Sequence, residues 1–249
     1  MDTVSTDTAG ERPAEPEPED DFEEEPIPPN ATPGTLVLRA PERLYAQIAE
    51  GKDLLPTIAY FARWTLAFSV IYGLGLGFFA AGWQIPAAGL KVPTLIVLSL
   101  LICLPALFTF NVILGSKLSF LQCTAVLSMA AYLTATILAS FAPILLFFAI
   151  SAGGHDFITL LNVAMCAIAG AFGVMWIWRA MTSLAERSGR EPNLTILRIW
   201  ILIYGFVGAQ MSWILRPFVG NPESFALFRK IQSNFFEAVW NMAKGFVGG

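Results

Sequence analysis

The segment from Leu118 to Trp178 restricts the possible folds more than any other part of the chain. Its 61 residues contain one formally charged side chain, Asp156, and one histidine, His155. A water-soluble domain does not bury so many nearly uncharged residues in a row, whereas two membrane spans with a short connection do. Two glycines stand immediately before His155, so we expect the connection there. The segment predicts two adjacent spans of a multi-span membrane protein.

The whole chain has the composition of a membrane protein. It is 55% hydrophobic and 14% charged, against about 25% charged residues in a typical soluble domain. Its apolar runs predict an all-α, polytopic transmembrane helix bundle with about five spans. The transmembrane domain is expected over residues 57–217, with spans at about 57–82, 93–114, 119–151, 157–179 and 195–215.

Two of these spans have features that bear on how they cross the membrane. The third, at 119–151, exceeds the roughly 20 residues that a bilayer requires, so it is expected to tilt, to extend beyond the bilayer or to kink near Pro143. The fourth ends in the aromatic pair Trp176 and Trp178, followed by Arg179. This order is typical of an interfacial aromatic belt with a charged anchor.

The first 40 residues are predicted to form a disordered, acidic and proline-rich tail. Residues 1–35 hold eleven of the 19 acidic residues of the chain and one basic residue, Arg12. Such a segment lacks the apolar surface needed to offset the entropy of ordering it. Two interpretations of the tail remain open: a solubilising segment, or a docking segment for a basic partner.

Two amphipathic segments flank the predicted spans. At 41–56 a short helix is expected, because Leu44, Tyr45 and Ile48 share one face. At 221–247 large apolar side chains recur at steps of three and four residues, with charged and amide side chains largely elsewhere on the helix. We expect the first to be an interfacial helix that leads into the membrane. The second would lie along the membrane surface or fold back against the bundle.

The distribution of Lys and Arg predicts the orientation in the membrane. With a cytoplasmic N-terminus, the segments on the inner side of the five spans hold nine of these residues and the outer segments hold five. Basic residues are enriched in cytoplasmic loops, so this count favours the N-terminus inside.

Small residues predict where helices approach closely. Gly73 and Gly77 form a G-x-x-x-G spacing within the first span, and Gly208 and Ser212 repeat that spacing in the fifth. Such pairs allow another helix to come near the backbone. Packing within the bundle and dimerisation are both compatible with this pattern.

Neutral amides are the most polar side chains expected inside the spans. The four candidates are Asn111, Gln122, Asn162 and Gln210. Amides in membrane helices hydrogen-bond one helix to another, or they line a pathway for a solute. Both interpretations remain open.

Catalytic and metal chemistry find little support. Three cysteines, Cys103, Cys123 and Cys166, stand apart in apolar runs, and only one histidine exists to join them, whereas a zinc site needs three or four ligands. His155 and Asp156 could form an acid–base pair or a pH-sensitive contact, but an ordinary polar turn explains them. We predict no enzymatic activity, no metal and no cofactor.

The exit from the fifth span carries candidate contacts for lipid or a partner. Trp213 and Arg216 precede Pro217, which ends the span. Arg216 would anchor the helix end, or it would bind a lipid phosphate or a partner carboxylate with the help of Arg229 and Lys230.

The same region carries a resemblance. The run W-I-L-R-P-F-V-G-N-P at 213–222, with Phe225, Phe228 and the N-F-F-E at 234–237, resembles a C-terminal motif of uncharacterised bacterial polytopic membrane proteins. It covers about forty residues, and no activity is attached to it. In layout, with an N-terminal tail before five spans, the chain also resembles the Yip1 group. The resemblance to the bacterial proteins implies the bacterial inner (cytoplasmic) membrane.

These features favour a non-enzymatic membrane scaffold or adaptor. The alternative is a small channel or transporter subunit that acts as an oligomer. The expected partners are the lipid bilayer, a protein bound through the acidic tail or the C-terminal helix, and another copy of the chain. No nucleic acid is expected.

Overall fold

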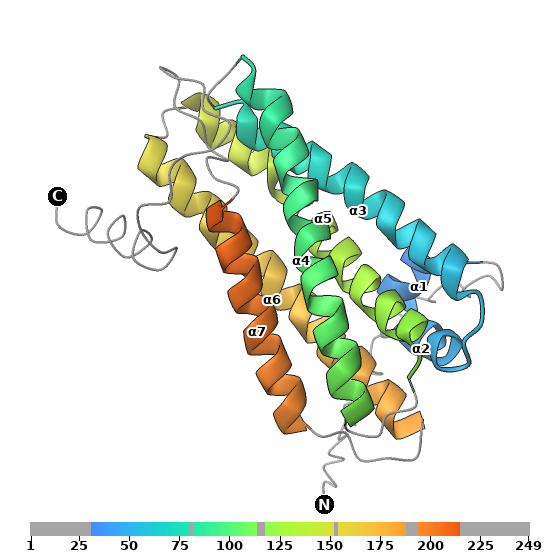
Figure 1. The fold of residues 1–249 in the computed structure, drawn as a ribbon. Coiled ribbons are helices and arrows are strands. Elements are labelled where there is room, and N and C mark those ends of the chain that lie inside the picture. The colour runs from blue at the N-terminus through green and yellow to red at the C-terminus, as the bar shows by residue number, and fades with distance from the viewer. Residues whose placement is uncertain (1–30, 80–81, 114–117, 152–153, 188–193, 215–249) are drawn as a thin grey trace, which may run out of the picture. The chain divides into compact units, whose positions relative to one another are not determined.

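The computed structural model describes residues 31–79, 82–113, 118–151, 154–187 and 194–214. Within these ranges the chain is helical and has no strand (Figure 1). The helices in order are α1 (Pro33–Arg39), α2 (Pro41–Ala49), α3 (Leu54–Gly77), α4 (Gln84–Ile113), α5 (Phe120–Ser151), α6 (His155–Arg187) and α7 (Leu194–Ile214).

Four of the described helices, α3, α4, α5 and α6, are long and apolar enough to cross a membrane. Helix α7 has 21 residues and contributes a shorter apolar stretch, Leu197–Ser212. Helices of this length satisfy their own backbone hydrogen bonds and need only apolar side chains to face lipid. The fold is therefore that of a membrane-integrated helix bundle.

Consecutive long helices run in opposite directions, so the bundle has two ends (Figure 1). At the basal end, α1, α2 and the first turns of α3, α5 and α7 meet the last turns of α4 and α6. At the distal end lie the last turns of α3, α5 and α7 and the first turns of α4 and α6. Helix α3 makes its most extensive contacts with α5 and α4, α6 packs on α5, and α7 packs on α4.

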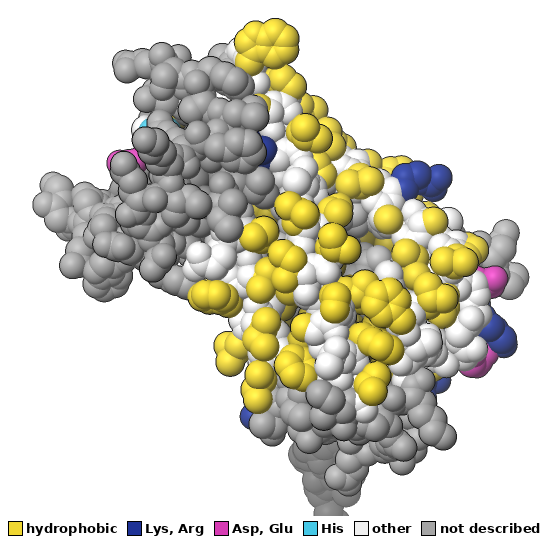
Figure 2. Space-filling view, in the orientation of Figure 1, with side chains coloured by type: hydrophobic (Ala, Val, Ile, Leu, Met, Phe, Trp, Pro, Cys, Tyr) yellow, Lys and Arg dark blue, Asp and Glu magenta, His cyan; other side chains and the backbone are white. Residues whose placement is uncertain are grey.

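The core lies where α3, α4, α5 and α6 meet. It includes Tyr72, Ile96, Leu138 and Ile158, one from each helix. In the face shown in Figure 2, hydrophobic side chains cover the area over α3, α4 and α7, and most charged side chains lie at its margin. An apolar interior inside an apolar exterior is the pattern expected of a bundle surrounded by lipid.

Helix α4 begins at Gln84, nine residues before the predicted start of the second span at 93. Pro93 and Pro105 both lie inside this helix. A proline removes one backbone hydrogen bond, but neighbouring membrane helices tolerate and compensate for the loss. The predicted start of this span at 93 is therefore too late for the helix, and Lys91 lies inside α4, only 6% exposed.

The predicted disorder of residues 1–40 does not extend to α1. The Thr32 hydroxyl accepts a hydrogen bond from the Thr35 amide at 3.3 Å, and Pro33 occupies the first helical turn. Leu36 and Val37 are buried. The acidic composition that predicted disorder ends before this point, and a capped start with two apolar anchors is enough to order one short helix.

Candidate functional site

Gln122 begins a cluster of polar contacts at the basal end. Ser119 stands just before the first residue of α5, and Gln122 is three residues further on. The backbone N–H of Gln122 donates to the Ser119 Oγ at 3.2 Å, and the backbone N–H of Ser119 donates to the Gln122 Oε1 at 2.7 Å. This reciprocal pair is a capping box, which satisfies two backbone donors at a helix start.

The same Gln122 side chain also closes the end of α2. Its Nε2 donates to the carbonyl oxygens of Ile48 and Ala49, both at 2.9 Å. These carbonyls belong to the last turn of α2, beyond which the helix supplies no regular N–H donors. The Ile48 carbonyl also accepts from the Gly51 N–H at 3.1 Å. Of the two predicted roles for this amide, the structure places it between two helices.

Helix α2 turns its apolar face toward protein. Leu44, Tyr45 and Ile48 are all buried, and α2 contacts α5 and α6. The helix ends at Ala49 rather than extending to 56, because Gly51 and Asp53 adopt positive φ angles of 73° and 49°. The apolar face of α2 therefore packs on the basal turns of the bundle. That α2 is also an interfacial helix leading into the membrane stays a prediction.

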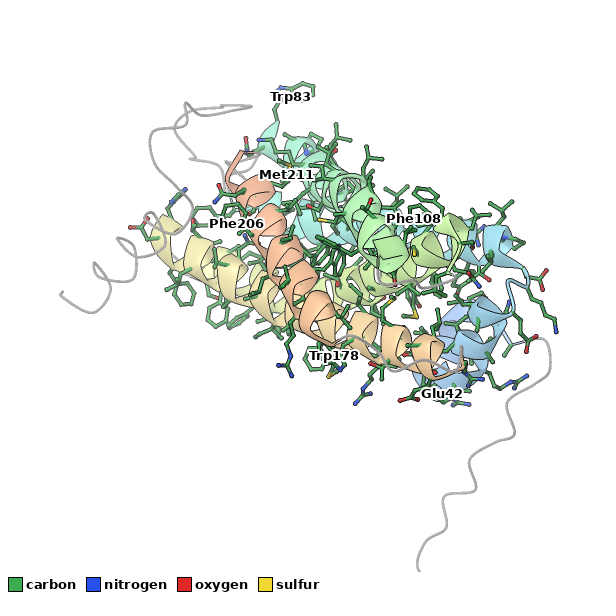
Figure 3. All side chains as sticks on the ribbon, turned by 60° about the horizontal axis from the view of Figure 1, so that its bottom comes forward. Glu42, Trp83, Phe108, Trp178, Phe206 and Met211 are labelled. Atoms are coloured by element: carbon green, nitrogen blue, oxygen red, sulfur yellow. The ribbon has the colours of Figure 1, made fainter. Side chains whose placement is uncertain are left out.

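A second set of contacts joins α2 to α6. The Ser183 hydroxyl donates to the Glu42 Oε2 at 3.3 Å, and the Arg187 guanidinium lies 3.6 Å from the same carboxylate. The Arg187 Nη2 also donates to the Glu42 carbonyl at 3.4 Å. Glu42 and Arg187 are exposed, so the pair contributes no more than about 1 kcal/mol and serves mainly to orient α2. Figure 3 labels Glu42 beside the last turns of α6.

The Tyr45 hydroxyl is buried between these contacts. It has no hydrogen-bond partner among the described residues. Burial raises the pKa of Tyr45 well above its ordinary value, the Glu42 charge adds to the rise, and the Arg179 charge opposes it. The tyrosine is therefore neutral at physiological pH.

Helix α1 lies across the basal parts of α3 and α5. A Cβ atom at Gly34 would come within 2.7 Å of the Tyr60 hydroxyl and 2.9 Å of the Tyr132 hydroxyl. A larger side chain at this position would require the two tyrosine hydroxyls to move. We refer to residues 33–49, which comprise α1 and α2, as the strap.

Asn162 joins α6 to α3 inside the bundle. The Tyr72 hydroxyl donates to the Asn162 Oδ1 at 2.8 Å, and the Cys166 Sγ lies 3.8 Å from the same oxygen. The Asn111 Nδ2 donates to the Leu107 carbonyl of its own helix at 3.0 Å, and it reaches α5 at the Cys123 Sγ, 3.9 Å away. Gln210, the fourth predicted amide, is half-buried on α7.

The first predicted glycine pair faces α4. A Cβ at Gly73 would come within 2.5 Å of the Ala88 carbonyl oxygen, and one at Gly77 within 2.6 Å of the Ile85 Cα. These glycines therefore pack within the bundle. A Cβ at Gly208 meets no described atom within 4 Å, and Ser212 is half-buried, so this second pair does not pack tightly on a described helix.

One packing glycine was not singled out from the sequence. A Cβ at Gly173 would clash with the Thr134 hydroxyl of α5. Ala169, four residues earlier, is fully buried on the same face of α6. The small-x-x-x-small spacing of these two residues was the available signal.

Several predicted contact residues lie outside the part of the chain that the structure describes. Arg216, Arg229, Lys230, the side chain of Trp213 and the segment at 221–247 lie outside the described residues. His155 and Asp156 begin α6, with 3.5 Å between the Nδ1 and Oδ1 atoms. In the described ranges, no three metal-binding side chains gather into a group.

Three arginines near the basal end lie over tryptophan rings. Arg63 is 5.9 Å from the centre of Trp64 on α3, and Arg179 is 5.8 Å from that of Trp176 on α6. Arg198 of α7 lies 5.8 Å from the centre of Trp178 on α6. The sequence indicated the belt on α6, but the contact from α7 requires the tertiary structure.

Comparison with known proteins adds no assignment: no family model, curated protein or solved structure matches the chain.

Proposed function

We propose that the protein is a non-enzymatic membrane scaffold or adaptor. The proposal rests on the contacts that the intramembrane amides make. Asn111, Gln122 and Asn162 each contact a second helix of the same chain. Amides that line a pathway must be able to exchange partners with a passing solute, whereas amides engaged between helices make a bundle rigid.

The acidic tail is the proposed docking segment. Its eleven carboxylates against one arginine in residues 1–35 would attract a basic surface over a Debye length of about 8 Å at physiological ionic strength. The partner that fits is a protein with a cluster of lysines and arginines. The bundle would hold this partner at the membrane.

The proposed topology has five spans with the N-terminus in the cytoplasm of a bacterial inner membrane. Support for α7 as the fifth span comes from its 21 residues, which extend about 30 Å as a helix. Support for the orientation comes from the described basic residues at the basal end: Arg39, Arg43, Lys52, Arg63, Arg179, Arg187 and Arg198. Among the described residues, the basic side chain at the distal end is that of Lys91.

Sidedness can be measured with single cysteines. Asp20→Cys and Lys244→Cys would be made separately in a cysteine-free chain, and sealed vesicles would be labelled with a membrane-impermeant thiol reagent. We expect the two positions to react from opposite faces. Reaction from the same face would mean an even number of spans.

The scaffold proposal is tested by replacing the tail carboxylates. In cells, a photo-crosslinker in the tail is expected to give a defined adduct that disappears when the eleven acids are replaced by amides. A scrambled tail of unchanged composition is the control and should retain the adduct.

A second test measures transport. Reconstituted protein should move no solute across liposome membranes. A solute flux that Asn162→Leu abolishes would refute the proposal.

A small channel or transporter subunit is the second candidate, and a column of buried hydroxyls favours it. Thr57, Thr65, Ser69 and Tyr72 are buried along α3, and the hydroxyls of Thr65 and Ser99 have no hydrogen-bond partner among the described residues. Lys91 is a buried ionisable group in the same bundle, a type of residue often associated with ion or substrate pathways. Solute flux that is lost in Lys91→Met and retained in Lys52→Met would favour this candidate.

A further inference from the structure

The strap is joined to the long helices by the chain at one end only. Residues 50–53 connect it to α3, and its other end continues into the acidic tail. Within this connection Gly51 and Asp53 adopt left-handed backbone conformations, with φ angles of 73° and 49°. Hinges between helices consist of a few loop residues that absorb a change in backbone angles. The connection at 50–53 is therefore a place about which the strap turns without losing its own helices.

Polar contacts hold the strap on the bundle at two points. The Glu42 carboxylate accepts a hydrogen bond from the Ser183 hydroxyl at 3.3 Å and lies 3.6 Å from the Arg187 guanidinium of α6 (Figure 3). We call these three residues the latch. The second point is Gln122 of α5, which binds two carbonyls in the last turn of α2. Because Glu42 and Arg187 are exposed, the latch is weak and sensitive to salt.

The Tyr45 hydroxyl opposes these contacts. Tyr45 is 1% exposed, and its hydroxyl has no hydrogen-bond partner among the described residues. On the bundle this hydroxyl has given up water without replacing it, which is unfavourable. At a membrane interface a tyrosine keeps its ring in an apolar layer and its hydroxyl in water. The strap therefore carries one group that is better solvated away from the bundle.

The apolar face of the strap is suited to protein and to lipid alike. On the bundle it buries Leu36, Val37, Leu44 and Ile48. Helix α3, a candidate membrane span, begins at Leu54, directly after the connection at 50–53, so the strap adjoins the point where the chain enters the membrane. An amphipathic helix buries its apolar face in a bilayer interface, and lipid tails are as apolar as leucine. The two environments nearly balance, so the small polar contributions decide between them.

We propose that the strap is a switch with two positions. In the closed position its apolar face packs on the bundle and the latch is made. In the open position the strap has turned about residues 50–53, the same face lies on the lipid surface, and the Tyr45 hydroxyl is in water. Opening moves the point at which the acidic tail is attached. The use of this movement to position a partner rests on the proposed function, whereas the movement itself does not.

The test measures where the strap lies in lipid nanodiscs. Nitroxide labels are attached at Arg43→Cys and Glu186→Cys in a cysteine-free chain, because both sites are exposed and adjoin the latch. Double electron–electron resonance gives the distribution of distances between the two labels. We expect a short distance from the closed position and a longer one from the open position.

Two substitutions should shift the ratio of open to closed in opposite directions. Tyr45→Phe removes the hydroxyl that lacks a partner and should lower the ratio about tenfold. Arg187→Gln breaks the latch and should raise the ratio about threefold. High salt should raise the ratio in the unsubstituted chain but not in Arg187→Gln. The matched controls, Tyr204→Phe on α7 and Arg63→Gln on α3, should leave the ratio unchanged.

A third label position tests whether the open strap meets lipid. Gln47 is half-buried at the margin of the apolar face of α2, and a label there should collide more often with dissolved oxygen, which concentrates in lipid, when Arg187→Gln opens the strap. A single distance in every variant, a ratio that Tyr45→Phe leaves unchanged or raises, or equal effects of Arg187→Gln and Arg63→Gln would each overturn the proposal. Opening without a gain in oxygen collisions would overturn the lipid-bound position.

Discussion

The two halves of α5 differ more than their sequence would suggest. From 122 to 133 the helix is buried at every position except Thr124, which is half-buried. From 134 to 151 buried positions are interspersed with exposed ones, and Ile144, Phe147 and Ile150 face outward. Both halves are apolar. The strap contributes to this difference, because α2 bonds Gln122 and α1 approaches Tyr132, both in the basal half.

The two halves are also held by different forces. The basal half is fixed by directional contacts, chiefly the three-way bonding of Gln122 and the glycine contact of α1 with Tyr132. Around the distal half, helix backbones approach closely, as at Gly73, and one buried hydrogen bond joins Tyr72 to Asn162. The polar contacts that hold the strap and the backbone packing at Gly73 predict distinct responses to mutation.

Gln122→Leu should have the largest effect. The substitution leaves the carbonyls of Ile48 and Ala49 and the Ser119 N–H without their side-chain partner, which we expect to cost about 2–4 kcal/mol. The loss of stability is measured by thermal unfolding in detergent and by protease cleavage in the segment that follows the strap. Gln47→Leu, on α2 itself, is the control. Equal destabilisation by both would remove the distinction between the two halves.

Gly73→Ala should be the strongest small change in the distal half. The new Cβ would press on the Ala88 carbonyl and force α3 and α4 apart, at a cost of about 1–3 kcal/mol. Gly170→Ala is the matched control, because no atom lies within 4 Å of a Cβ there. Denaturation in mixed micelles compares the stabilities of the two variants. If Gly73→Ala unfolds at the same denaturant concentration as Gly170→Ala, backbone packing does not hold this half.

The Tyr72–Asn162 bond tests how much one polar contact contributes inside the bundle. A double-mutant cycle with Tyr72→Phe and Asn162→Leu should yield a coupling of about 1 kcal/mol, the usual size for such bonds in membrane proteins. Unfolding of the four proteins in detergent gives the coupling. Additive effects would mean that the bond contributes nothing beyond packing.

The smallest expected effect is the pH dependence of the turn that follows the strap. The hydrogen bond and charge of Lys52 lower the pKa of Glu50, and Glu50 in turn raises the pKa of Lys52. The contribution of Glu50 is present above its unfolded pKa of 4.5 and is lost as the pH falls through the lowered folded value. That of Lys52 is present below 10.5 and is lost as the pH rises past the raised value.

Both groups are fully solvated, so the change in stability at either extreme should be slight. Melting temperatures of the wild type and Glu50→Gln across the acid range check the sign. A variant whose melting temperature falls as steeply with acid as that of the wild type would show that this pair does not contribute.

Much of the architecture follows from the sequence alone. Long runs with almost no charge, such as Leu118–Trp178, leave the backbone no choice in lipid except helices. The shared face of Leu44, Tyr45 and Ile48 likewise marks a helix with one side to bury. Such features are local, because they depend on the composition and spacing of neighbouring residues.

The tertiary structure decided which surface each face meets. It placed the face of α2 against α5 and α6, kept Lys91 inside a helix that continues through Pro93, and brought Arg198 to Trp178. Hydropathy cannot distinguish an apolar face that meets lipid from one that meets another helix, since both environments favour the same side chains. Only the packing of distant segments makes that distinction.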